Sequence, residues 1–420
     1  MIKDNKKRFD MAKKTKRASY LLYPIMVIAS FFSLIWYRHK VKKINCKGLK
    51  APYIVLATHS SMVDFNAAVK ATFPNRVTWI TSIEEFNRSE WLMRNIGCIA
   101  KRKFTKDPLV VKHCLRTIKN KGILIIYPEA RFSFAGIPEH IDGALGKLVK
   151  TSKCPLIIMR NNGHYIQSPQ FSKHPYRKIP LFSEFEQVVT REQVSTLTAD
   201  EIQKIIEEKF YYDDYSYQKE HNYKVTCKKR MDNVHKVLYK CPHCNTEFEM
   251  FAKGTKIKCN HCNIEYELDE YGTLKCLNGE TIFDSIPKWY LWEKEEVIKE
   301  VRSGKYYFED QVKLEELFKP CVGFVPMGTV KFTHDLTGMK LEGKLDDGSD
   351  FSFFRPCLEQ ESCHVEFFFK NHKKEIGSAI DFATLDQTYF GWLVNQKEAL
   401  TKIHLATEAI YNLALENKNK

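Results

Sequence analysis

The chain lacks the features of a secreted protein. Its one long apolar stretch, residues 20–37, is followed by more positive charge and by no small-residue cleavage site, which argues against a signal peptide. Without a secretory signal, 13 cysteines, an odd number, argue for a reducing compartment and against a disulfide framework. No internal repeat is present, and 420 residues exceed one ordinary domain, so we expect two or three domains.

The apolar stretch is also short for a membrane span. It contains no charge and one proline, and a bilayer core needs about 20 apolar residues. Lys/Arg clusters flank both ends, whereas the positive-inside rule would place both flanks in the cytoplasm. We therefore interpret residues 1–43 as a basic segment that anchors the protein to an anionic membrane surface, on the cytoplasmic face. A true span and a buried core helix remain as alternatives.

Acidic residues are scarce mainly in this segment. Residues 1–43 hold 12 basic and 2 acidic residues, a net of +10 out of +15 for the whole chain. The remaining +5 is spread over 377 residues, which is too diffuse for a surface that tracks nucleic-acid phosphates. We therefore expect no nucleic-acid partner.

Apolar runs alternate with amphipathic stretches between residues 53 and 159, which predicts an α/β layer. Two of the stretches between the strand-like runs predict helices, over residues 84–96 and 108–119. His59 and Asp64 follow the strand-like run 53–58, and Glu129 follows the run 122–127. Ligands of α/β sheets bind beyond the carboxyl ends of strands, so the two motifs should meet in one crevice. A histidine beside a carboxylate suits general-base chemistry. The alternative is a capped helix start, with Asp64 in the first turn.

Four motifs in this order resemble the glycerolipid acyltransferase family typified by 1-acylglycerol-3-phosphate (lysophosphatidate) acyltransferase. His59 and Asp64 match its H-x4-D motif. Residues 97–102 resemble its second motif and residues 127–133 its third, F-P-E-G-T-R-S, with alanine for glycine and the arginine shifted by one. The run 155–158 resembles the fourth motif.

The resemblance implies acyl transfer from acyl-CoA or acyl carrier protein to the hydroxyl of a lysophospholipid, in phospholipid biosynthesis. His59 would be the base and Asp64 would orient it. Arg102 and Arg131 would bind phosphate through bidentate contacts, and Glu129 would position the glycerol or hold these arginines. For Arg102 the alternative is a solvated basic face with its lysine neighbours. Backbone N–H groups near residues 60–62 would stabilise the oxyanion.

Two Cys-x-x-Cys pairs, Cys241/Cys244 and Cys259/Cys262, are separated by 14 residues. This spacing is typical of the two knuckles of a ribbon that bind one structural Zn²⁺. Four thiolates complete a tetrahedral shell, so we expect His243 and His261 to be spectators. The alternative is four free cysteines.

The overall prediction is a mixed sheet flanked by helices, a zinc ribbon, and a β-rich module with a closing helix. The module resembles pleckstrin-homology and GRAM domains in outline. The expected boundaries are 1–43 for the anchor, 44–215 for the acyltransferase domain, 216–279 for a linker and the ribbon, and 280–420 for the module. Thr198 and Glu201 form a capping-box signature that predicts the start of the helix closing the acyltransferase domain. The aromatic and acidic tract 211–217 after this helix is interpreted as a linker. Two other functions remain open: a nucleic-acid-binding zinc-ribbon protein and an inactive, lipid-binding acyltransferase relative.

Overall fold

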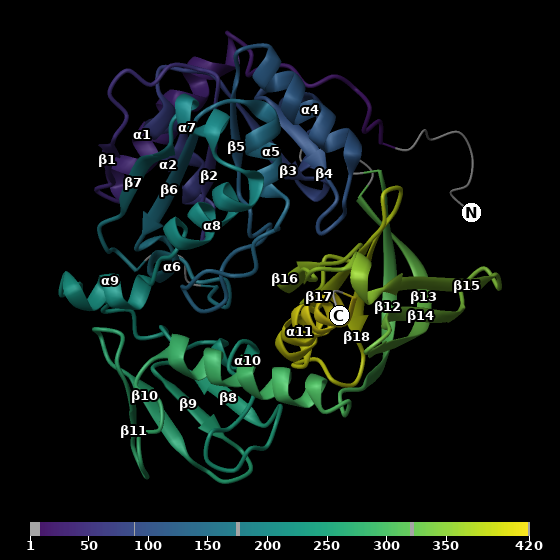
Figure 1. Ribbon diagram of the computed structural model, residues 1–420. Helices are drawn as coiled ribbons and strands as arrows, with labels where there is room; N and C mark the ends of the chain where they lie inside the picture. The colour runs from purple at the N-terminus through teal and green to yellow at the C-terminus, as the bar shows by residue number, and fades with distance from the viewer. Residues whose placement is uncertain (1–8, 88, 174–176, 320–322, 419–420) are drawn as a thin grey trace. The chain divides into compact units, whose positions relative to one another are not determined.

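A computed structural model describes residues 9–87, 89–173, 177–319 and 323–418 (Figure 1). The chain forms two compact units. The first contains residues 1–101, 107–170 and 175–225, and the second contains residues 102–106, 171–174 and 226–420. The boundaries expected from the sequence, at residues 43, 215 and 279, stay a prediction.

The first unit is built on a seven-stranded mixed sheet in the order β1-β7-β6-β2-β5-β3-β4. All neighbouring strands run parallel except β6 and β7. The prediction of a mixed sheet is therefore confirmed. The strands are β1 (Lys40–Ile44), β2 (Tyr53–Ala57), β3 (Val77–Ser82), β4 (Cys98–Lys101), β5 (Ile123–Ile126), β6 (Leu156–Asn162) and β7 (Phe182–Val189).

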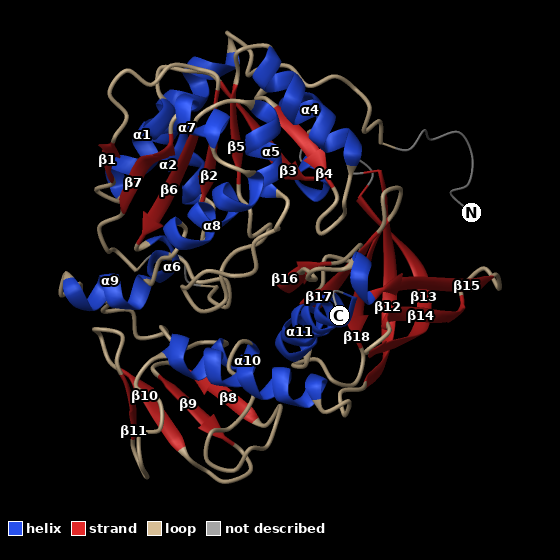
Figure 2. Ribbon diagram, in the orientation of Figure 1, coloured by secondary structure: helices blue, strands red, loops and turns tan. Residues whose placement is uncertain are grey.

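Helices flank this sheet (Figure 2). An apolar cluster joins Ile54 and Leu56 of β2 to residues of four helices, which are α4 (Pro108–Lys119), α5 (Leu145–Ser152), α7 (Arg191–Thr196) and α8 (Ala199–Lys209). Ile54 and Leu56 share one face of β2 because side chains alternate along a strand. Helices α1 (Leu22–Trp36) and α2 (Val63–Thr72) pack against each other.

Helix starts in this unit follow local capping chemistry. Thr198 and Glu201 form the expected capping box at α8, and Asp107 caps α4 ahead of Pro108. The expected continuous helix over 84–96 is wrong. A 3₁₀ helix, Ile83–Asn87, and a short helix, α3 (Glu90–Asn95), replace it, because the Ser89 side chain caps a new helix start there.

Helix α1 is the apolar stretch noted in the sequence, and it is 15 residues long. Ser30 and Ser33 hydrogen-bond to Asn66 of α2, at 3.1 Å each, which fixes the polar side of the helix. The other side presents an apolar stripe spaced three or four residues apart, Leu21, Ile25, Ile28, Phe32 and Ile35, with Trp36 next to its last member, and all six side chains are exposed. Among the described residues, no helix has both the length and the hydropathy that crossing a bilayer requires.

The aromatic and acidic tract 211–217, interpreted from the sequence as a linker, is instead packed into the first unit. It contributes the start of α9 (Asp214–Glu220), whose Asp214, Tyr215 and Tyr217 are buried. Asp213 caps the helix by accepting bonds from two backbone N–H groups. The two acidic residues of the tract are therefore a helix cap, Asp213, and a buried acceptor, Asp214.

The second unit contains two antiparallel sheets. The smaller has the order β11-β10-β9-β8, and the larger has the order β15-β14-β13-β12-β18-β17-β16. The larger sheet is two meanders, of four and three strands, joined through β12 and β18. The predicted β-rich module with a closing helix is confirmed. The elements are β8 (Met250–Lys253), β9 (Lys256–Cys259), β10 (Glu265–Leu268), β11 (Leu274–Cys276), α10 (Ile286–Arg302), β12 (Phe308–Lys319), β13 (Gly323–Asp335), β14 (Gly338–Lys344), β15 (Asp350–Pro356), β16 (Val365–Lys370), β17 (Ile376–Ala383), β18 (Thr388–Leu393) and α11 (Leu400–Lys418).

One ion cluster ties these parts of the second unit together. The Lys402 ammonium of α11 lies 2.7 Å from a carboxylate oxygen of Glu247 and 2.9 Å from one of Glu300. Glu247 belongs to the small-sheet region and Glu300 to α10. The small sheet, α10 and α11 therefore share one cation.

Candidate functional site: a histidine–aspartate pair at the sheet edge

Three neighbouring parallel strands end at the same edge of the first unit's sheet. Strand β2 leads to His59, β5 to Glu129 and β6 to His164. His59 donates its backbone N–H to Oε2 of Glu129 at 2.9 Å, so the predicted meeting of the two motifs is confirmed. This edge is where α/β sheets bind ligands.

His59 and Asp64 form a close pair. Nδ1 of His59 lies 3.0 Å from Oδ2 of Asp64, and the histidine side chain keeps 22% exposure while the aspartate is fully buried. Because Nδ1 faces the carboxylate, Nε2 is left to face a substrate. The spacing of five residues allows this contact because Asp64 lies in the first turn of α2. The alternative interpretation, a capped helix start, placed Asp64 in the same turn.

His164 is a site residue that the sequence reasoning missed. Its Nδ1 lies 2.6 Å from the second oxygen of Asp64, and its side chain is fully buried. Burial opposes ionisation of Asp64, but hydrogen bonds from His164 and His59 outweigh it and hold the pKa of Asp64 below its usual range. The available signal was a histidine directly after a third buried strand.

His39 lies next to His164 and is uncharged. The two rings are 5.6 Å apart, and Nε2 of His39 lies 2.8 Å from the Ser183 hydroxyl. Burial lowers the pKa of His39 to about 2, with the charges of His164 and Lys70 adding to the effect. His39 follows α1 in the chain, so the C-terminal end of that helix lies near this edge of the sheet.

Glu129 is a buried hub. Its Oε1 accepts from the backbone N–H of Glu139 at 3.0 Å and from the Tyr212 hydroxyl at 3.1 Å. Burial raises the pKa of Glu129 to about 8, partly offset by the N–H groups of Glu139 and His59. Through its bond from the His59 N–H, Glu129 thus fixes the backbone of His59.

Aromatic rings pack around His59. The Tyr127 ring stacks on the imidazole at 4.2 Å between centroids, and the Phe132 ring lies at 4.5 Å. Both come from the segment that carries Glu129. These contacts restrict the ring to an orientation that suits the bond to Asp64.

Residues 38–166 match the family model described as Acyltransferase. The chain carries an acyltransferase-family domain. No curated protein matches the chain. Among solved structures, it is similar to the crystal structure of 1-acyl-sn-glycerophosphate (LPA) acyltransferase, PlsC, from Thermotoga maritima. That likeness has 16% identity and a TM-score of 0.38, and it covers 44% of this chain and 76% of that one.

In the acyltransferase domain, Ala130 stands at the position of the third motif's glycine and adopts a backbone conformation that glycine favours. Its φ is +54°, in the left-handed region that favours glycine, and its N–H donates to the Tyr127 carbonyl at 3.1 Å. The turn that delivers Glu129 therefore survives the substitution at some cost in strain.

The two candidate arginines are both buried. Arg131 lies 3.5 Å from the Glu139 carboxylate, inside the first unit. Arg102 belongs to the second unit, where its guanidinium donates to the carbonyls of Leu385 and Asp386 at 2.7 and 3.0 Å. The alternative of a solvated basic face at Arg102 is wrong. A phosphate-binding role stays a prediction for both residues.

The backbone donors expected near residues 60–62 are partly used. The N–H groups of Ser60 and Ser61 both donate to Oδ2 of Asp64, at 2.6 and 2.9 Å. They stabilise the aspartate charge. The oxyanion-hole prediction is therefore wrong for these two groups.

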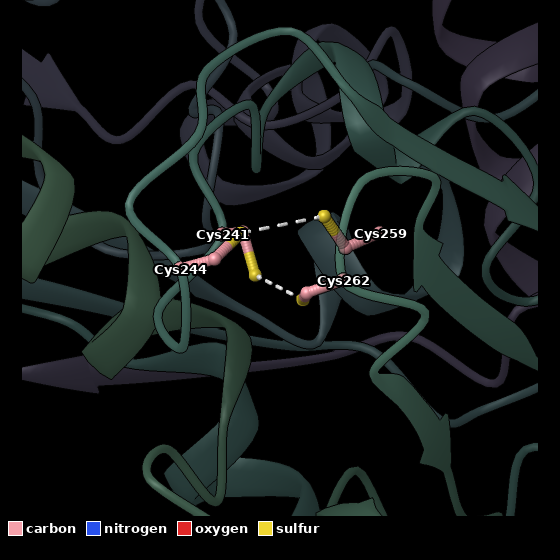
Figure 3. A group of neighbouring side chains, drawn as sticks. All are labelled: Cys241, Cys244, Cys259 and Cys262. Carbon is pink, nitrogen blue, oxygen red and sulfur yellow. Dashed lines mark hydrogen bonds between the residues drawn. The ribbon is translucent and has the colours of Figure 1, made fainter.

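The four paired cysteines of the second unit converge (Figure 3). Their sulfur atoms all lie within 4.8 Å of one another, with 3.6 Å between Cys241 and Cys262 and 3.8 Å between Cys244 and Cys259. Four sulfurs at about 2.3 Å from one metal ion in a tetrahedron lie roughly 3.8 Å apart. The cluster could therefore hold a metal ion. His243 faces the Tyr266 hydroxyl at 2.9 Å.

Proposed function

We propose that the protein transfers a fatty acyl group from a thioester, acyl-CoA or acyl carrier protein, to the hydroxyl of a lysophospholipid such as 1-acylglycerol-3-phosphate. The observation that carries the proposal is the His59–Asp64 pair, at 3.0 Å, on a sheet edge where Glu129 fixes the His59 backbone. The acyltransferase family match supports the reaction class.

In the proposed reaction, Nε2 of His59 takes the proton from the acceptor hydroxyl as its oxygen attacks the thioester carbon. Asp64 stabilises the imidazolium that forms, as the carboxylate does in a serine hydrolase triad. The tetrahedral intermediate then expels the thiolate, and the proton on His59 passes to it. The substrate oxygen is the nucleophile, so no acyl-enzyme forms.

The protein works on lipids at a membrane surface, on the cytoplasmic face. Support comes from α1, whose exposed apolar stripe, including Ile28 and Phe32, suits an interfacial helix with basic flanks. The end of this helix leads to His39, whose ring packs against His164 beside the Asp64 carboxylate. An acceptor with one acyl chain could therefore present its hydroxyl to His59 without leaving the surface.

The metal held by the four cysteines is Zn²⁺, in a structural role. Four thiolates fill a tetrahedral shell and leave no open position for substrate. The small sheet would then be a zinc ribbon whose fold depends on the ion.

Substitution of His59 by alanine tests the central claim. Loss of a general base lowers kcat by about 10²- to 10⁴-fold. Acyl transfer to lysophosphatidate is measured with acyl-CoA and with acyl carrier protein as donors, and exposed His221 changed to alanine is the matched control. Unchanged turnover in a folded His59→Ala protein would remove His59 as the base and favour the lipid-binding alternative.

A further inference from the structure

A cavity of about 370 Å³ opens in the first unit, away from the histidines. Its lining comes from the segment before α1 and from the starts of parallel strands. The lining residues are Arg17, Tyr20, Tyr23, Ala51, Pro74, Asn75, Arg76, Lys121 and Ile123.

The lining contains three cationic side chains, Arg17, Arg76 and Lys121, and no carboxylate. Within the part of the chain that the structure describes, none of the three forms an ion pair with Asp or Glu. Such an excess of positive charge around one hollow is unfavourable unless an anion offsets it. Two arginines favour a phosphate, whose oxygens accept paired bonds from a guanidinium.

Arg76 is held in place by its neighbours. Its guanidinium stacks on the Tyr20 ring at 3.4 Å, and Nη1 donates to the Ala18 carbonyl at 2.8 Å. The Tyr23 hydroxyl donates to the Asn75 carbonyl at 2.8 Å, which fixes the adjoining wall. An arginine fixed in this way loses little side-chain entropy when it binds a ligand.

The cavity is separate from the catalytic pair. Ala51 precedes β2 and Ile123 begins β5, whereas His59 and Glu129 follow the ends of these strands. The five residues of β2 therefore separate the two sites by roughly 17 Å. A phosphate in the cavity is not the phosphate next to the reacting hydroxyl.

We propose that this cavity binds the phosphate of an anionic phospholipid in the membrane surface. The argument for a lipid is position: Tyr20 lines the cavity, and the apolar stripe of α1 begins at the next residue, Leu21. The lipid's acyl chains would run along Leu21 and Ile25 while its phosphate sits between the cations. This inference rests on the proposed placement of α1 at a membrane.

Two matched pairs of variants test the cavity, using the full chain and phosphatidylcholine vesicles with or without phosphatidate. Arg76→Lys keeps the charge but loses the bidentate geometry, and Arg38→Lys is the same change at an exposed residue of the basic flank. Lys121→Gln and exposed Lys14→Gln remove one charge each. We expect Arg76→Lys to weaken vesicle binding about fivefold, Arg38→Lys to leave it unchanged, and Lys121→Gln to weaken it more than Lys14→Gln.

The proposal would be overturned if vesicle binding were the same in Arg76→Lys as in Arg38→Lys, and the same in Lys121→Gln as in Lys14→Gln. A rise in melting temperature of the wild type with inorganic phosphate alone, absent in Arg76→Lys, would assign the cavity to a soluble anion and overturn the lipid assignment. A double variant, Ile28→Glu and Phe32→Glu, tests the placement of α1 at the membrane. Vesicle binding that stays intact in this double variant would also overturn the proposal. In detergent micelles, Arg76→Lys and Lys121→Gln should keep acyl transfer within twofold of wild type. Loss of acyl transfer in His59→Ala tests the catalytic proposal separately.

Discussion

Asp64 contacts two histidines at this edge of the sheet, His59 through Oδ2 and His164 through Oδ1. His59 contacts substrate in the proposed reaction, whereas His164 acts through Asp64 and is a positioning residue. The division explains why a fully buried histidine lies where no substrate reaches it. It also makes the two histidines separable by experiment.

Changing His164 to leucine removes a donor to Asp64 and should lower kcat by about 10- to 10²-fold, less than loss of the base. Because hydrogen bonds from His164 and His59 hold the pKa of Asp64 down, the variant raises that pKa. Protonation of Asp64, and the loss of activity that it causes, should then begin at higher pH, so the low-pH end of the kcat–pH profile should fall more steeply than in the wild type. His164→Asn retains a donor and should restore much of the profile. A lowered kcat with an unmoved pH profile in His164→Leu would reduce His164 to a packing role.

Ala130 offers a stabilising change within a functional motif. Its φ of +54° costs an alanine about 1 kcal/mol more than a glycine. Ala130→Gly should therefore raise the denaturant midpoint, with little change in the slope. Ala144→Gly, at a residue with φ of −88°, is the control and should lower it or leave it unchanged. A lower midpoint in Ala130→Gly would show that the turn is not strained.

At the scale of elements, we expect the fold of the proposed zinc ribbon to depend on its metal. Chelation should release about one Zn²⁺ per chain and lower the melting temperature, because the binding free energy of a structural zinc is also folding free energy. Cys241→Ser with Cys259→Ser should purify without zinc and melt at the chelated temperature. Cys227→Ser, outside the cluster, is the control. Protein that purifies metal-free, with melting unaffected by chelator, would refute a zinc ribbon.

The sequence predicts elements well where local signals agree. The amphipathic helix α4 falls at the expected residues 108–119, since Asp107 and Pro108 start it and its apolar residues recur at helical spacing. The predicted continuous helix over 84–96 is wrong because the Ser89 side chain caps the start of a new helix within this stretch. Two site residues, His164 and Tyr212, come from segments distant in sequence, and only the tertiary fold brings them to Asp64 and Glu129.

Buried carboxyl groups make the stability of the folded chain depend on pH. Burial raises the pKa of Glu129 from 4.5 to about 8 and that of Asp214 from 3.8 to about 7. Between about pH 4.5 and pH 8 the folded chain therefore binds more protons than the unfolded chain, and these groups lower stability as the pH rises. Each contributes a slope of up to about 1.4 kcal/mol per pH unit.

Thermal unfolding across this window checks the effect. Glu129→Gln, which cannot ionise, should show a flatter fall in melting temperature than the wild type, whereas Glu208→Gln, at an exposed residue of α8, should match the wild type. Parallel curves for wild type and Glu129→Gln would mean that Glu129 does not titrate in this range.

The two units are interleaved along the chain, because residues 102–106 and 171–174 belong to the second unit although first-unit segments flank them. A single cut after residue 225 would leave the carbonyls of Leu385 and Asp386 on one fragment and the Arg102 side chain that binds them on the other. A simple swap of gene segments at this cut would therefore exchange the first unit without keeping this contact of the second. Any ancestor that acquired the second unit also had to acquire its segment 102–106 between two first-unit segments, so the two units are expected to have been inherited together.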